Sequence, residues 1–148
     1  AVAAVVANVP APQNFECKPV AQATSVMIMN GTEDPLVPYA GGEINLLGLF
    51  FKGGPIMSSR ASAQYFADWA QLAGAPETRE ETVAEGVRVE QNRWSAAGAK
   101  TEVELVTIHG GGHGLPQPYA RRPRLLGPSP MEPNGPTMIW AYFERQPK

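Results

Sequence analysis

The stretch TEVELVTIHGGGHG, residues 101–114, decides how this chain folds, because it joins an apolar run to a glycine-rich turn that carries both histidines. Residues 101–108 are rich in branched apolar side chains, as is typical of a strand inside a sheet. The glycines that follow let the backbone turn sharply and keep bulky neighbours away from His113. The stretch therefore predicts a core strand whose carboxyl end leads into a loop bearing a histidine.

Two further apolar runs predict strands beside this one. They are AVAAVVANVP at residues 1–10 and TSVMIMNG at residues 24–31. Both are nearly continuous, as expected for strands buried on both faces of a parallel sheet. The alternating stretch GVRVEQNRW, residues 86–94, predicts an edge strand that pairs with the 101–110 run.

Helical patterns alternate with these strands. Apolar residues recur at three- and four-residue steps from Ser58 to Ala73, with Ser58 or Ser59 as the cap and Gly74 and Pro76 closing the helix. A last helix is expected from Pro136 to Glu144. Strands alternating with helices predict an α/β fold with a mostly parallel sheet, built as a single domain over residues 1–148.

Composition excludes several classes of protein. The 148 residues are 43% hydrophobic and 18% charged, which indicates a globular chain, and the net charge of −2 argues against nucleic acid as a partner. No stretch reaches the roughly 20 apolar residues that span a bilayer, so no membrane association is expected. The only local basic cluster, Arg121, Arg122 and Arg124, is expected to be a solvated loop. The single cysteine, Cys17, has no partner within the chain, and whether it is paired elsewhere stays open.

Asp34 and His113 are the candidate catalytic residues. Asp34 follows the 24–31 strand and His113 follows the 101–108 strand, and active groups of α/β sheets lie beyond the carboxyl ends of strands. An aspartate that accepts the imidazole N–H would fix the tautomer of the histidine and stabilise the imidazolium. The two residues therefore suit the acid and the base of a Ser-His-Asp triad. Glu33 is the rival carboxylate.

Other interpretations of the glycine loop are weaker. A His-Gly-Gly-Gly sequence can form an oxyanion loop, but that loop precedes its nucleophile, and no Gly-x-Ser-x-Gly follows His109. We expect His109 to be structural. A zinc site with Glu33 and Asp34 would need His109 and His113 on one helical face, which three intervening glycines disfavour. We expect neither a metal nor a cofactor.

No residue of the chain fits the nucleophile of such a triad. None of the six serines lies in a Gly-x-Ser-x-Gly elbow, and each is interpreted as structural; they are Ser25, Ser58, Ser59, Ser62, Ser95 and Ser129. Cys17 has no glycine elbow either. The residue patterns therefore offer an acid and a base but no nucleophile.

Four stretches resemble the α/β-hydrolase esterases of the poly(3-hydroxybutyrate) depolymerase and feruloyl esterase family. They are VMIMNGTEDPLVPYAGGE, RASAQYFADWAQLAGAP, VELVTIHGGGHGLPQPY and RRPRLLGPSPMEPNGP. In the family, Trp-Pro often follows the histidine, whereas here the pair is Leu115-Pro116. The resemblance implies that the chain is the C-terminal portion of such an enzyme, with Asp34 as acid and His113 as base. The nucleophile serine and the first strands would lie on a missing N-terminal segment.

The resemblance also implies partners and location. A complementary N-terminal segment, another copy of the chain or a rearranged sheet would cover the strand at residues 2–9, whose free edge invites pairing. An ester would be the substrate, and the protein would be secreted or periplasmic. The loops over residues 41–55 and 115–133 would shape the pocket, with the apolar stretch NLLGLFFKGGP as a substrate wall or a core anchor. The alternative is a catalytically inactive, truncated α/β module that self-associates.

Overall fold

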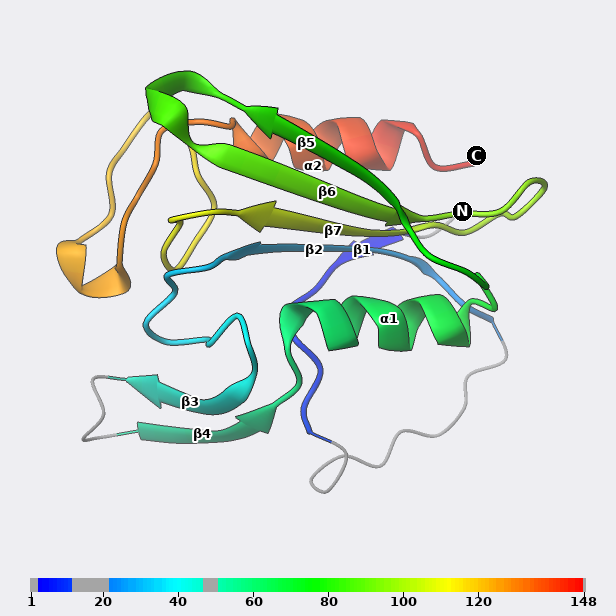
Figure 1. Cartoon of the computed structure of the whole chain (residues 1–148), viewed down its shortest axis with the longest axis horizontal. Coiled ribbons are helices and arrows are strands. Elements are labelled where there is room, and N and C mark those ends of the chain that lie inside the picture. The colour runs from blue at the N-terminus through cyan, green and yellow to red at the C-terminus, as the bar shows by residue number, and fades with distance from the viewer. Residues whose placement is uncertain (1–2, 12–21, 47–50, 148) are drawn as a thin grey trace.

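The computed structural model describes residues 3–11, 22–46 and 51–147, and it places one helix on each face of a five-stranded sheet (Figure 1). Two short 3-10 turns and a separate hairpin complete the described part. In chain order the elements are β1 (Ala3–Val5), β2 (Ser25–Gly31), β3 (Gly42–Leu46), β4 (Phe51–Ile56), α1 (Ser59–Trp69), β5 (Glu77–Thr82), η2 (Ala84–Gly86), β6 (Arg88–Trp94), β7 (Val103–Ile108), η3 (Arg124–Leu126) and α2 (Gly135–Glu144).

The sheet is mixed, in the order β1-β2-β7-β6-β5. β1, β2 and β7 pair parallel, whereas β6 pairs antiparallel with β7 and β5 pairs antiparallel with β6. The α/β character is therefore confirmed, but a mostly parallel sheet is not, because β5 and β6 are joined by a turn too short for a crossover. The carboxyl ends of β2 and β7 lie side by side, toward the left of Figure 1.

Each face of the sheet packs against one helix. Ala63 and Ala67 of α1 are fully buried and pack against Val26, Ile28 and Leu105. On the opposite face Tyr142 of α2 packs against Met27, Val106 and Ile108. Because β2 and β7 contribute to both clusters, their sequences read as continuous apolar runs, as the strands between two layers should.

The prediction for residues 1–10 was wrong in length and in burial. Only Ala3–Val5 form β1, and Val5 is 39% exposed. β1 lies at the edge of the sheet and pairs only with β2 among the described strands. An edge strand is covered by fewer neighbours than a central one, which explains the exposure. Val9, beyond the strand, is buried and contacts α1 through its N–H, which donates to Ser62 Oγ.

Residues 86–94 do pair with the 101–110 run, but β6 is not the edge strand. β5, with the sequence ETREET, lies outside it and was not foreseen. Its charged side chains have no apolar period that would predict a strand. They nevertheless suit an exposed edge strand, where charge discourages pairing with other chains.

The loop expected over residues 41–55 is instead the antiparallel hairpin of β3 and β4. Residues 47–50, which include most of the proposed apolar wall, lie outside the described residues, as does Cys17. The helix expected to reach Ala73 ends at Trp69, because Gln71 takes a positive φ of 57° and the Leu72 N–H returns to Ala67 O. The expected Ser58 cap and the last helix are confirmed.

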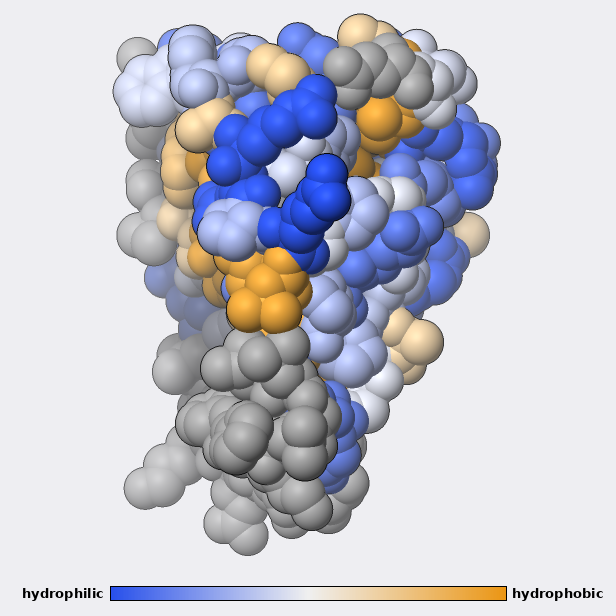
Figure 2. All heavy atoms as spheres, turned by 90° about the vertical axis from the view of Figure 1, so that its left-hand side faces the viewer, coloured by the Kyte–Doolittle hydropathy of each residue, from blue (hydrophilic) through white to orange (hydrophobic). Residues whose placement is uncertain are grey.

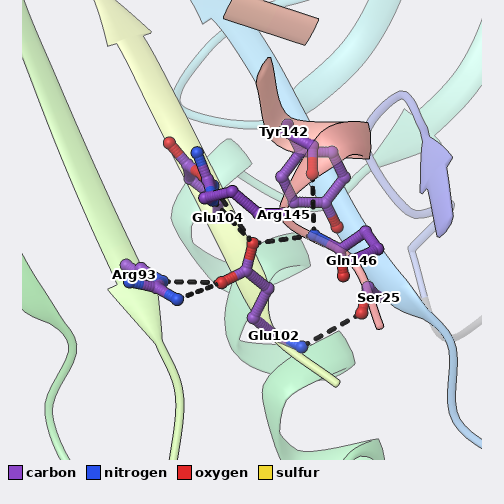
Figure 3. Close-up of polar contacts among 7 residues, drawn as sticks. All are labelled: Ser25, Arg93, Glu102, Glu104, Tyr142, Arg145 and Gln146. Atoms are coloured by element: carbon purple, nitrogen blue, oxygen red, sulfur yellow. Dashed lines mark hydrogen bonds and ion pairs between the residues drawn. The ribbon is translucent and has the colours of Figure 1, made fainter. Parts of the chain in front are cut away.

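An ion-pair cluster attaches the end of α2 to the amino end of β7 (Figure 3). Arg145 donates to both Glu102 and Glu104, whose side chains are 8% and 5% exposed. Arg93 Nε and Gln146 Nε2 also donate to Glu102, at 2.7 and 2.8 Å. Burial alone would raise the pKa of Glu102, but the Gln146 hydrogen bond, the charge of Arg145 and the hydrogen bond from Arg93 together hold it below its ordinary value.

We predict that Glu102→Gln destabilises the fold by about 2 kcal/mol at pH 7. This is less than the roughly 3–5 kcal/mol of a fully buried pair, because Arg93 and Arg145 stay 44% and 41% exposed. Since the folded-state pKa of Glu102 is lowered, its contribution is complete above the unfolded pKa and is lost as the pH falls through the folded one. The urea unfolding free energies of the wild type and the variant should therefore converge as the pH falls below the folded-state pKa of Glu102. Glu144→Gln, at an exposed position of α2, is the control, and a gap that stays constant with pH would contradict the prediction.

Candidate functional site

Asp34 and His113 form a hydrogen-bonded pair at the carboxyl ends of β2 and β7. His113 Nδ1 lies 2.9 Å from Asp34 Oδ2. The two strands are parallel neighbours, with Gly31 opposite Ile108, so the loops that follow them start side by side. The aspartate side chain is 8% exposed and the imidazole 40% exposed. The pair therefore has a sheltered carboxylate and a ring that reaches solvent.

The turn after β2 holds the Asp34 carboxylate. Its Oδ1 accepts the N–H groups of Leu36 and Val37 at 2.8 and 2.9 Å, a local turn that aspartate favours. This leaves Oδ2 for His113. Because one carboxylate oxygen binds backbone N–H groups and the other faces the histidine, the backbone helps to fix the orientation of the carboxylate.

Three contacts fasten the two loops together. Glu33 N–H donates to Gly111 O at 2.8 Å, and Gly110 N–H donates to Thr32 Oγ1 at 2.9 Å. Gly31 lies so close to the histidine loop that a Cβ there would fall 2.1 Å from Gly111 O. Only glycine permits this approach, which brings His113 within hydrogen-bond range of Asp34.

A strap formed by residues 126–128 holds the histidine loop from its other side. His113 N–H donates to Leu126 O at 2.6 Å, and Gly112 N–H donates to Pro128 O at 2.7 Å. Gly127, with a φ of 80°, packs against Glu33 O and Gly112 Cα. Sequence reasoning missed the strap, because its contacts are backbone to backbone and leave no side-chain signature.

His109 has a different environment from His113. Its Nδ1 lies 2.9 Å from Arg88 Nη2, and its buried Nε2 lies 3.5 Å from Glu90 Oε2. Glu33 is exposed and holds the loop through its backbone. Among the described residues, no three His, Cys, Asp or Glu side chains gather where they could hold a metal ion, so the disfavoured grouping of His109 and His113 with Glu33 and Asp34 is not formed there.

The serines with hydrogen bonds in the described part of the chain serve the fold. Ser25 Oγ accepts Glu102 N–H at the amino end of the sheet, opposite to His113. Ser58 caps α1, and Ser59 Oγ accepts from Asn30. Ser129 accepts from Arg122 N–H. No serine of the described residues is hydrogen-bonded to His113, so the nucleophile expected of a triad is not found there.

No family model matches the chain, and no curated protein matches it. None of the described helices is long and apolar enough to cross a membrane. The predicted proximity of Asp34 and His113 is observed, while their catalytic role stays a prediction.

The pair can act as a general base. A hydrogen bond from Nδ1–H to Asp34 leaves the lone pair on Nε2, which has no hydrogen-bond partner among the described residues. The imidazole would accept a proton at Nε2 while the carboxylate stabilises the resulting cation.

We predict that diethyl pyrocarbonate modifies His113 about tenfold faster than His109. The reagent needs an accessible imidazole lone pair, and His109 has a buried Nε2 and an Nδ1 occupied by Arg88. Peptide mapping after timed exposure measures both rates in one sample. Equal rates, or faster modification of His109, would contradict the assigned environments. Asp34→Asn serves as the control for the hydrogen bond.

Proposed function

We propose that this chain carries the acid–base pair of a carboxylic-ester hydrolase that works with a serine nucleophile, resembling the poly(3-hydroxybutyrate) depolymerase and feruloyl esterase family. The observation that carries the proposal is the 2.9 Å contact between His113 Nδ1 and Asp34 Oδ2, beyond the ends of adjacent parallel strands. Active groups of open α/β sheets occupy this position.

The proposed reaction has two halves. His113 Nε2 takes the proton of the serine hydroxyl as its oxygen attacks the ester carbonyl, and Asp34 stabilises the imidazolium. The tetrahedral intermediate then expels the alcohol, which receives that proton from His113. Water attacks the acyl-enzyme in the same way, with His113 again accepting and returning a proton, and the acid product leaves.

In this proposal the serine comes from a complementary segment that completes the sheet. Two features support it. The hydrogen-bonded serines of the described residues are occupied elsewhere, and β1 pairs with only one strand among those described, with Val5 39% exposed. A strand laid along the outer side of β1 would cover this edge. The loop over residues 115–133, which includes the strap, would form the wall beside the imidazole.

Hydrolysis of p-nitrophenyl acetate tests whether the pair works on an ester. An imidazole with a free Nε2 attacks activated esters even without serine, so the purified chain should show slow turnover. We expect His113→Ala to lower the rate about tenfold, Asp34→Asn to lower it less, and the matched variant His109→Ala to leave it unchanged. A rate unaffected by His113→Ala would contradict the proposal.

Labelling with a fluorophosphonate, read by intact mass, tests where the nucleophile lies. We expect no adduct on this chain. An adduct that disappears in His113→Ala would support the hydrolase function but would show that the serine lies within this chain. The alternative, an inactive α/β module that self-associates through β1, is favoured by the same exposed edge. It predicts no His113-dependent turnover together with a dimer in analytical ultracentrifugation.

A further inference from the structure

Three arginines in the segment that follows the histidine loop differ from the other arginines of the chain. Arg79, Arg88, Arg93 and Arg145 each pair with a glutamate, and Arg60 donates to Asn92. Arg121, Arg122 and Arg124 have no carboxylate partner among the described residues. Arg121 Nη2 donates only to Met131 Sδ, at 3.8 Å. In a chain with more acidic than basic residues, three cations within four positions that lack a carboxylate partner among the described residues are not explained by the fold.

The guanidinium of Arg122 lies directly beside the histidine loop. A Cβ on Gly114 would fall 2.4 Å from Arg122 Nε and 2.6 Å from its Cζ. Gly114 also has a φ of 120°, a conformation that other residues rarely adopt. Glycine at this position therefore lets a positive charge approach the residue next to His113.

Arg124 is connected to the histidine loop through the backbone. It begins η3, whose last residue, Leu126, accepts the His113 N–H at 2.6 Å. The strap that positions the imidazole is therefore continuous with the arginine segment. Arg121 and Arg122 are the exposed residues that lead into it.

Apolar surface accompanies these charges. Tyr119 is 83% exposed and Leu125 is 52% exposed, on either side of the arginines in the chain. Figure 2 shows this face of the molecule, where strongly hydrophilic side chains border an apolar patch. A surface with fixed positive charge and adjoining apolar side chains suits a ligand that is both anionic and partly apolar.

We propose that Arg121, Arg122 and Arg124 form an anion-recognition surface that selects esters carrying a free carboxylate elsewhere in the molecule. This proposal rests on the proposed ester hydrolysis at His113 and names its substrate class. The guanidinium groups bind the carboxylate, which orients the ester group toward the imidazole. Arginine suits this task because its planar fork matches a carboxylate.

Binding of two matched esters tests the proposal. Monomethyl glutarate carries a carboxylate, and dimethyl glutarate is its neutral counterpart. Titration into the ¹⁵N-labelled chain, followed through the amides of residues 111–114 and 122–127, should show binding of the anionic ester about tenfold tighter, as expected for exposed charges acting together. Added salt should reduce the preference.

Substitutions of single arginines test which residues produce the preference for the anionic ester. Arg122→Gln and Arg124→Gln should each remove most of the preference, and Arg79→Gln, on β5, should leave it unchanged. Equal binding of the two esters, or an equal loss in Arg79→Gln, would overturn the proposal. An acidic peptide bound far more tightly than the ester, with no shift at residues 111–114, would also overturn it and assign the arginines to a protein partner.

His113→Ala separates this proposal from the function on which it rests. The preference for the anionic ester should survive that substitution, because the arginines provide it. Lost turnover with retained preference supports both proposals. Retained turnover in His113→Ala contradicts the hydrolase alone, and an absent preference beside His113-dependent turnover contradicts the anion surface alone.

Discussion

The hydrogen bond between Asp34 and His113 is the interaction around which the candidate site is built. It exists only if β2 and β7 are parallel neighbours with closely joined loops. Every nearby feature serves that closeness. Gly31 permits the approach of Gly111, and the backbone turn of Asp34 leaves one carboxylate oxygen free for the imidazole. The pair is held by backbone contacts, so its geometry should be stiff before any substrate arrives, as catalytic preorganisation requires.

The two ends of the sheet differ in how their charged side chains are paired. At the amino end of β7, Glu102 and Glu104 are engaged by arginines that tie α2 to the sheet, so the charges there are mutually satisfied. At the carboxyl end, Arg122 and Arg124 have no carboxylate partner among the described residues, and the imidazole of His113 is 40% exposed. The paired carboxylates and arginines at the amino end stabilise the fold. The arginines without a carboxylate partner, beside an exposed base, are available to a ligand.

The sequence predicts those parts of the molecule that depend on local pattern. The apolar runs of β2 and β7, the Ser58 cap and the position of Asp34 and His113 after adjacent strands all follow from residue type and spacing. β5 was missed because an exposed, charged edge strand has no apolar period. The strap was missed because backbone carbonyls of Leu126 and Pro128 hold the site, and any residue has a carbonyl. The length of β1 depends on which strands flank it, which local pattern does not encode.

The tautomer of His113 shows whether the Asp34–His113 hydrogen bond orients the imidazole as a base. A free neutral imidazole can carry its proton on either nitrogen, and the hydrogen bond of one nitrogen decides the tautomer. Long-range ¹H–¹⁵N correlation on the neutral side chain distinguishes the two forms. We expect the proton on Nδ1, facing Asp34, and an unprotonated Nε2. The Asp34→Asn substitution should abolish this tautomer preference. A proton on Nε2, or a tautomer ratio that Asp34→Asn leaves unchanged, would contradict this expectation.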